Sequence, residues 1–225
     1  MDIPRSLKEI LTTLPSDGKV TLVAVSKFHP AESVIAAYDA GQRVFGESRV
    51  QELVAKAAEL PDDIQWHYIG HLQTNKVSQL LKVSNLSLIE SVDSFKLLDV
   101  LETTAQKLSR RIDILLEIHV AREETKSGFN TAELISWYKN GGPSNLKFLR
   151  IRGLMGMATN TDDETEIRKD FQSITTCFNK IKELSSTPED FDILSMGMSG
   201  DYQIAIGEGS NMVRIGSSIF GERSY

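Results

Sequence analysis

Short apolar runs that alternate with helix-forming segments constrain the fold of this chain more than any other feature of its sequence. The first run, residues 20–25, is apolar at nearly every position and leads directly into Ser26 and Lys27. A run without polar alternation is typical of a strand buried on both faces of a parallel sheet. We therefore expect Lys27 at the carboxyl end of a strand, where α/β proteins bind ligands and barrels collect catalytic residues.

The unit of a strand followed by a helix recurs along the whole sequence. Strands are expected at residues 20–25, 43–45, 65–69, 86–89, 112–120, 148–154, 191–194 and 212–215. No linker or low-complexity tract divides them, so the pattern predicts an α/β fold, a (β/α)8 TIM barrel, as one domain over residues 1–225. Residues 1–18 are expected to supply a helix that packs on the barrel. An open doubly wound sheet is the alternative, but the Gly-x-Gly at residues 207–209 follows a helix and is typical of a helix end.

Composition and charge limit the partners that the chain can have. A net charge of −6 argues against nucleic acid and anionic membranes, because both require a positive surface. The single cysteine, Cys177, excludes an internal disulfide and a cysteine-rich zinc site. No apolar run is long enough to span a membrane, and charged residues interrupt the N-terminal segment, so we expect a cytoplasmic protein.

In a barrel, the loops that follow the strands converge on one mouth. Here they would supply Lys27, Ser48, His71, Ser91, Lys126, Met157, Ser199 and Ser217. The last two loops, residues 195–200 and 214–218, combine glycine with serine hydroxyls and lead into expected helices, a combination that suits phosphate. The alternative is that these residues only make tight turns. A reactive lysine opposite a phosphate cradle suits a phosphorylated aldehyde held as a Schiff base, and pyridoxal 5'-phosphate fits that description. A barrel that binds a sugar phosphate without using Lys27 is a second possibility.

Six ordered motifs strengthen the first of these two interpretations, in which the ligand is pyridoxal phosphate. They occupy residues 24–27, 45–52, 66–76, 153–155, 194–199 and 213–216, within a resemblance that extends from about Lys19 to Tyr225. Together they resemble the pyridoxal phosphate homeostasis protein family, which looks like the barrel domain of alanine racemase standing alone. The resemblance implies that Lys27 forms the Schiff base and that Ser199, Gly216 and Ser217 bind the phosphate. It also implies that Arg214 faces the pyridine nitrogen and leaves it unprotonated, which makes the ring a poor electron sink.

The complete set of cofactor-binding residues that we expect follows from these motifs. It is Lys27, Ser48, Met155, Ser195, Ser199, Arg214, Gly216 and Ser217, with no catalytic and no metal-binding residue. Three positions depart from the usual family pattern. Ser48 stands where the family usually has asparagine, His119 stands where it often has asparagine, and Glu90 stands where it often has histidine. We expect none of the three to touch the lysine or the phosphate loops.

Other motifs predict local structure or exclude other chemistry. Ser48-x-x-Gln51 and Asn130-x-x-Glu133 are typical of helix caps. His67 and His71 are four residues apart, but a strand and Gly70 intervene, so the pair does not indicate a metal site. Ser199 lacks the Gly-x-Ser-x-Gly context of a hydrolase nucleophile.

The sequence therefore favours a non-enzymatic protein that holds pyridoxal phosphate on Lys27, takes part in vitamin B6 homeostasis and delivers the cofactor to pyridoxal-phosphate-dependent apoenzymes. The alternative is a low-activity, single-domain amino-acid racemase. A two-base racemase needs a group on each face of its substrate, and in alanine racemase a further β-domain brings the second one. Only ten residues follow Ile215, so we expect no such domain. We expect a monomer or a weak homodimer.

Overall fold

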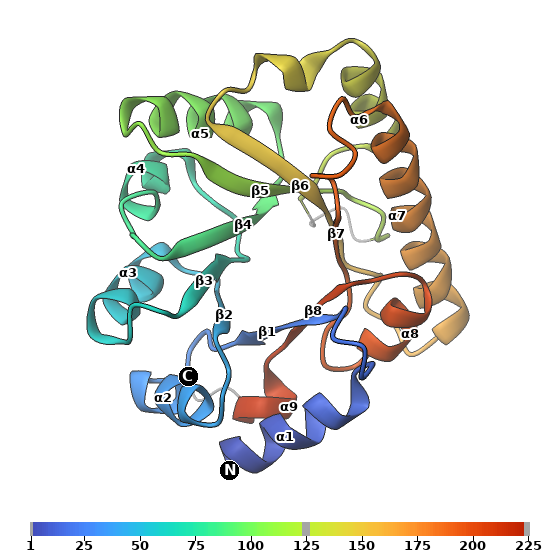
Figure 1. Cartoon of the computed structure of the whole chain (residues 1–225). Coiled ribbons are helices and arrows are strands. Elements are labelled where there is room, and N and C mark those ends of the chain that lie inside the picture. The colour runs from blue at the N-terminus through green and yellow to red at the C-terminus, as the bar shows by residue number, and fades with distance from the viewer. Residues whose placement is uncertain (1, 123–126, 223–225) are drawn as a thin grey trace.

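The strands of the computed structural model, which describes residues 2–122 and 127–222, form a closed parallel barrel (Figure 1). In chain order they are β1 (Thr21–Val25), β2 (Val44–Glu47), β3 (Gln65–Tyr68), β4 (Leu86–Val92), β5 (Ile112–Glu117), β6 (Leu149–Met155), β7 (Ile193–Ser195) and β8 (Met212–Ile215). Each pairs with its neighbours in the sequence, and β1 pairs with β8 to close the sheet. The predicted TIM barrel is thus confirmed, and the open doubly wound sheet is wrong.

Helices surround the barrel and connect successive strands (Figure 1). They are α1 (Ile3–Thr13), α2 (Ala31–Asp39), α3 (Val50–Glu59), η1 (Thr74–Lys76), α4 (Val77–Leu80), α5 (Phe95–Lys107), α6 (Thr131–Lys139), η2 (Gly142–Asn145), α7 (Glu164–Leu184), α8 (Tyr202–Gly207) and α9 (Ser217–Phe220). Helix α1 precedes the first strand and packs against α2 and α9, and its Leu7 is fully buried. In the part of the chain that the structure describes, no helix is both long and apolar enough to cross a membrane.

Two helix starts test the capping patterns in the sequence. Asn130 Oδ1 accepts hydrogen bonds from the N–H groups of Ala132 and Glu133, as predicted for the start of α6. The predicted cap at Ser48 is wrong, because α3 begins at Val50 after Arg49 and has no side-chain cap. Ser48 instead accepts the Tyr68 hydroxyl on its carbonyl oxygen, at 3.2 Å.

The ends of β4 and β5 differ most from the sequence prediction, by three residues each. Strand β4 continues to Val92, three residues beyond the predicted end, because Glu90 is buried inside the barrel although it carries a charge. Strand β5 ends at Glu117, before the predicted Val120, and Ile118 makes only an isolated bridge to Phe129. A hydrophobic run marks burial, but it does not distinguish a paired strand from a buried loop.

The interior of the barrel is divided into an apolar layer and a polar one. Side chains from five strands form the apolar layer: Val23, Leu88, Leu115, Met155 and Met212. Residues two positions further along a strand point to the same side, so Glu90, Glu117 and Arg214 also face inward, nearer the carboxyl ends. All three are buried. The floor of the mouth is therefore charged rather than apolar.

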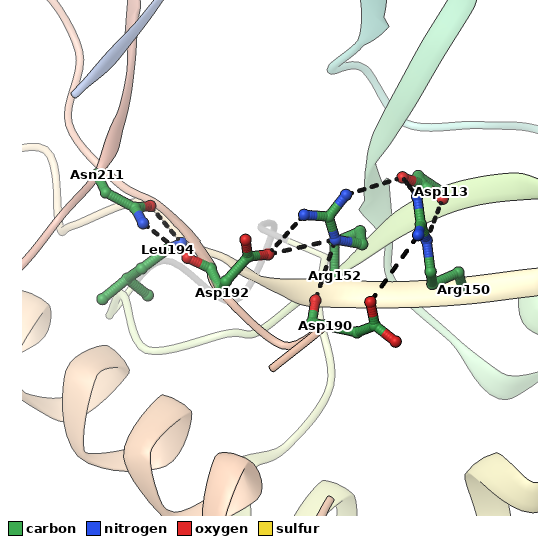
Figure 2. Close-up of polar contacts among 7 residues, drawn as sticks. All are labelled: Asp113, Arg150, Arg152, Asp190, Asp192, Leu194 and Asn211. Atoms are coloured by element: carbon green, nitrogen blue, oxygen red, sulfur yellow. Dashed lines mark hydrogen bonds and ion pairs between the residues drawn. The ribbon is translucent and has the colours of Figure 1, made fainter. Parts of the chain in front are cut away.

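An ion-pair chain ties the opposite, amino ends of the last four strands together (Figure 2). Asp113 Oδ2 lies 2.6 Å from Arg150 Nη2 and 3.1 Å from Arg152 Nη1, and Arg152 Nη2 lies 2.7 Å from Asp192 Oδ1. Asn211 continues the chain, since its Nδ2 donates to the Asp192 carbonyl at 2.6 Å. This end of the barrel is organised for stability, which leaves the other end for chemistry.

Candidate functional site

A cavity of about 250 Å³ opens at the carboxyl ends of the strands. Its lining includes five of the eight residues predicted from the sequence: Lys27, Ser199, Arg214, Gly216 and Ser217. Val25, His29, Ile69, Met157, Met198, Gly200 and Gly221 complete the lining. The structure therefore brings the lysine after β1 together with the loops after β7 and β8, and strand pairing between β1 and β8 is the reason.

Lys27 lies in a tight turn whose backbone is under strain. The N–H of His29 donates to the Ser26 carbonyl at 3.1 Å, which closes the turn around Lys27 and Phe28. Phe28 has a φ of +68°, the value that the third position of a type II turn requires and that glycine usually supplies. A bulky residue in this region costs energy and persists only where its surroundings hold it, and such strain is concentrated at functional sites.

A buried charge cluster holds this turn from below. Lys56, on α3, places its Nζ 2.9 Å from the Ser26 carbonyl oxygen, 2.6 Å from Glu47 Oε1 and 2.8 Å from Glu52 Oε1. Glu47 Oε1 also accepts the Ser26 hydroxyl at 2.6 Å, and Glu52 Oε1 accepts the Phe28 N–H at 2.8 Å. The residues on both sides of Lys27 are thus fixed by one lysine and two carboxylates.

Glu47 is the most deeply buried carboxyl of this cluster. Desolvation raises its pKa to about 7, although the charge of Lys56 and the hydrogen bonds from Lys56 and Ser26 act in the opposite direction. Its second oxygen, Oε2, is buried and has no hydrogen-bond partner among the described residues. The charge of the cluster beneath Lys27 therefore changes close to neutral pH.

The loops after β7 and β8 meet on the other side of the cavity. The Gly216 N–H lies 3.4 Å from Ser199 Oγ, so the two loops are in direct contact. Gly197 has a φ of +93°, and an added Cβ would lie 2.8 Å from Tyr202 Cα, so only glycine fits at this turn. Ser199 and Ser217, half-buried and exposed, present hydroxyls beside the small residues Gly200 and Gly216.

Arg214 forms part of the cavity floor and is only 5% exposed. Its Nη1 donates to the Ser195 carbonyl at 2.9 Å and to the Ser195 hydroxyl at 2.6 Å, and its Nη2 donates to the Gly156 carbonyl at 3.1 Å. Three of the five N–H donors of the guanidinium are therefore used to fix its plane.

Glu90 corrects one expectation from the sequence, since it does contact the functional loops. Its Oε2 accepts the Ser195 hydroxyl at 2.6 Å and lies 3.8 Å from Arg214 Nη1, and its Oε1 lies 2.7 Å from His67 Nδ1. Desolvation opposes ionisation of Glu90, but His67, Arg214 and Ser195 together outweigh it and lower the pKa. A carboxylate thus stands directly behind the guanidinium.

Three predicted cofactor-binding residues lie away from the cavity lining. Met155 belongs to the apolar layer beneath the floor and is 1% exposed, and Ser195 is fully buried as the link between Arg214 and Glu90. Ser48 lies against Gly70, where an added Cβ would meet the Ser48 backbone at 2.2 Å. Lys126, also expected at the mouth, lies outside the described residues.

Sequence reasoning did not identify Lys56, or Glu90 and Glu117 as parts of the site. Each is a single buried charge on an element that otherwise has an ordinary pattern of apolar and exposed residues. Each meets its partners only through tertiary contacts. Glu117, on β5, is 5% exposed; desolvation raises its pKa to about 7 against the charge of Arg214. Charged residues at the carboxyl ends of apolar strands are the pattern that would have pointed to Glu90 and Glu117.

His67 and His71 have separate partners. His67 is buried against Glu90, whereas the His71 side chain is 65% exposed and its Nδ1 lies 2.8 Å from Asp93 Oδ2. Among residues 2–122 and 127–222, no group of three histidine, cysteine or carboxylate side chains is placed to hold a metal ion.

A larger groove of about 690 Å³ lies at the opposite end of the barrel, between the starts of β5 and β6 and the end of α7. The cations at its lining are Arg111, Lys147 and Arg150, all exposed, and Arg150 is already paired with Asp113. Buried polar groups do not converge there as they do at the Lys27 cavity, so the smaller cavity is the better candidate.

Comparisons with known proteins agree with this fold. The chain is 42% identical over 214 residues to the human protein named pyridoxal phosphate homeostasis protein, a match that covers 91% of this chain and 77% of that protein. The structure of PipY from Synechococcus elongatus with PLP bound superposes with a TM-score of 0.85 at 36% identity, over 97% of this chain and all of PipY. Alanine racemase from Bartonella henselae shares the fold, with a TM-score of 0.74 at 17% identity, over 99% of this chain and 59% of that protein. The family described as alanine racemase, N-terminal domain, matches residues 4–224. The family match and these relatives cover most of the chain. The chain therefore belongs to the alanine racemase N-terminal domain family and, within it, to the pyridoxal phosphate homeostasis proteins.

Proposed function

We propose that this protein binds pyridoxal 5'-phosphate, holds it as a Schiff base on Lys27 and serves intracellular vitamin B6 homeostasis as a binding protein rather than as an enzyme. The observation that carries the proposal is the cavity in which Lys27 lies together with Arg214 and the paired loops of Ser199 and Ser217. The cofactor bound to PipY supports the same ligand for this chain.

The donors of the cavity fit the chemical groups of this ligand. When bound, pyridoxal phosphate supplies an aldehyde that a lysine amine can capture with loss of water. Lys27 lines the cavity from the clamped turn, and hydroxyl and backbone N–H groups of the two facing loops suit a phosphate. The Arg214 guanidinium on the floor suits an uncharged ring nitrogen, because arginine does not give up its proton.

The same arrangement supports binding over turnover. A protonated ring nitrogen makes the ring a stronger electron sink, and a guanidinium held beside the nitrogen would keep it unprotonated and so weaken carbanion chemistry. Lys27 and His29 line the cavity, but both belong to one turn after β1 and therefore approach from one side. A two-base racemase needs acid–base groups on opposite faces of its substrate. Relatives are named homeostasis proteins, which supports delivery to apoenzymes that depend on this cofactor.

The first experiment is the visible spectrum of the purified protein with pyridoxal phosphate, followed by borohydride reduction and peptide mass mapping. We expect an imine band and a reduced adduct on Lys27. Lys27→Ala should abolish the band and retain part of the phosphate-driven binding, whereas Lys82→Ala, which alters an exposed lysine outside the cavity lining, should change neither. An adduct spread over surface lysines would overturn the proposal. Sustained turnover of an amino acid by wild type but not by Lys27→Ala would favour the racemase.

A further inference from the structure

A line of buried polar groups crosses the barrel directly behind the cavity floor. It runs from His67 on β3 to Glu90 on β4, then through the Ser195 hydroxyl on β7 to Arg214 on β8. Every member is at most 5% exposed. Arg214 is the one member that also lines the cavity, so this guanidinium connects the buried line to any ligand.

We propose that Glu90 is the built-in counter-charge of Arg214 and that it limits how tightly the cavity binds an anion. Glu90 Oε2 lies 3.8 Å from Arg214 Nη1 and shares the Ser195 hydroxyl with it, so the carboxylate offsets the guanidinium at close range. The inference rests on the proposed function in one respect: a protein that delivers a phosphorylated cofactor must also release it.

The charges around the cavity show why one buried carboxylate matters. Lys27 from β1 and Arg214 from β8 are the cationic side chains of the described lining, together with the imidazole of His29. Glu90 from β4 and Glu117 from β5 face Arg214 from the interior, and Asp93 follows β4 near Glu117. His67 from β3 faces Glu90. In a water-poor interior such charges act over longer distances than in solvent, so the charge of Glu90 also lowers the positive potential at the loops of Ser199 and Ser217, which it does not touch.

Arg214 does not depend on Glu90 alone for its position. Two backbone carbonyls, those of Ser195 and Gly156, accept from its guanidinium independently of the carboxylate. Removing the charge of Glu90 should therefore leave the cavity shape intact and change mainly its potential. A residue with only a structural role would weaken binding when altered, whereas a counter-charge should strengthen anion binding when neutralised.

The test measures the affinity of the apo full-length protein for inorganic phosphate by calorimetry at pH 9, above the usual titration range of imidazoles. Glu90→Gln keeps the shape and removes the charge, and we expect it to bind phosphate about fivefold more tightly than wild type. Glu90→Asp keeps the charge and should stay close to wild type. Weaker or unchanged phosphate binding by Glu90→Gln would overturn the inference.

A second variant covers the case in which Glu90→Gln fails to fold. The double change His67→Leu and Glu90→Met replaces the buried pair by apolar side chains of similar volume, while the Arg214 guanidinium keeps its two backbone carbonyl partners. It should also bind phosphate more tightly than wild type, and wild-type or weaker affinity would overturn the inference. The imine spectrum of wild type is a separate measurement. If the imine band were absent, the proposed function would be wrong, but the comparison of phosphate affinities between wild type and the Glu90 variants would remain valid.

Discussion

The ammonium of Lys56 lies 2.9 Å from the carbonyl oxygen of Ser26, the residue directly before Lys27. Lys56 and Lys27 come from different elements and have opposite roles: one is buried and paired, and the other lines the cavity. The buried lysine fixes the backbone from which the cavity lysine extends.

Lys56→Met should destabilise the protein strongly. It leaves Glu47 and Glu52 without their cation, and breaking a buried ion pair in this way costs about 3–5 kcal/mol. Guanidinium unfolding at fixed pH measures the loss. Lys180→Met is the matched control, because Lys180 pairs with Glu183 at the surface and should contribute less than about 1 kcal/mol. Equal losses in the two variants would contradict the cluster's role.

Phe28→Gly should be more stable than Phe28→Ala by about 1 kcal/mol, because only glycine adopts a φ of +68° without steric cost. Both variants lose the contact between the Phe28 ring and Arg49, so the comparison isolates the backbone. Urea unfolding of the two variants gives the difference directly. If alanine were the more stable residue, the turn would not be strained as described.

Glu117 should make the protein less stable as pH rises. Its pKa is raised by desolvation from 4.5 to about 7, so between these values the folded state holds a proton that the unfolded state has released. Stability is then highest below about pH 4.5 for this group, falls up to about pH 7 and is constant above, with a total effect of at most about 3 kcal/mol.

Glu117→Gln should remove the share of the pH dependence that Glu117 contributes and be more stable than wild type at pH 8, with the difference shrinking towards pH 5. Chemical unfolding at a series of pH values tests the slope. Glu183→Gln, which alters an exposed carboxylate, should leave the slope unchanged. A wild-type slope in Glu117→Gln would mean that another group, such as Glu47, carries the pH dependence.

Gly197→Ala should destabilise the protein by about 2–4 kcal/mol and weaken phosphate binding. Its φ of +93° is unfavourable for alanine, and the new methyl group would meet the Tyr202 backbone at 2.8 Å, which would displace the loop that carries Ser199. Gly200→Ala, three residues later, meets nothing within 4 Å and should change stability by less than about 0.5 kcal/mol. Thermal unfolding and phosphate calorimetry on both variants compare the two glycines.

The sequence by itself determined the barrel and the place of its chemistry. Unbroken apolar runs such as residues 20–25, each followed by a helix, have few solutions other than a closed parallel sheet, and this rule placed Lys27, Arg214 and the two serine-rich loops at one end. These assignments rest on local periodicity, which a chain carries in its sequence whatever lies across the barrel.

Only the tertiary structure decided which buried charges meet. Glu90 and Ser195 are 105 residues apart, and Lys56 reaches Ser26 from α3, the second helix after it, so no spacing rule connects them. The same limit explains why Met155 and Ser195, predicted at the cofactor, lie beneath the cavity floor: strand periodicity gives the side to which a residue points, but the depth of its layer depends on how all the strands are staggered. That stagger is fixed only when β1 and β8 pair and the barrel closes.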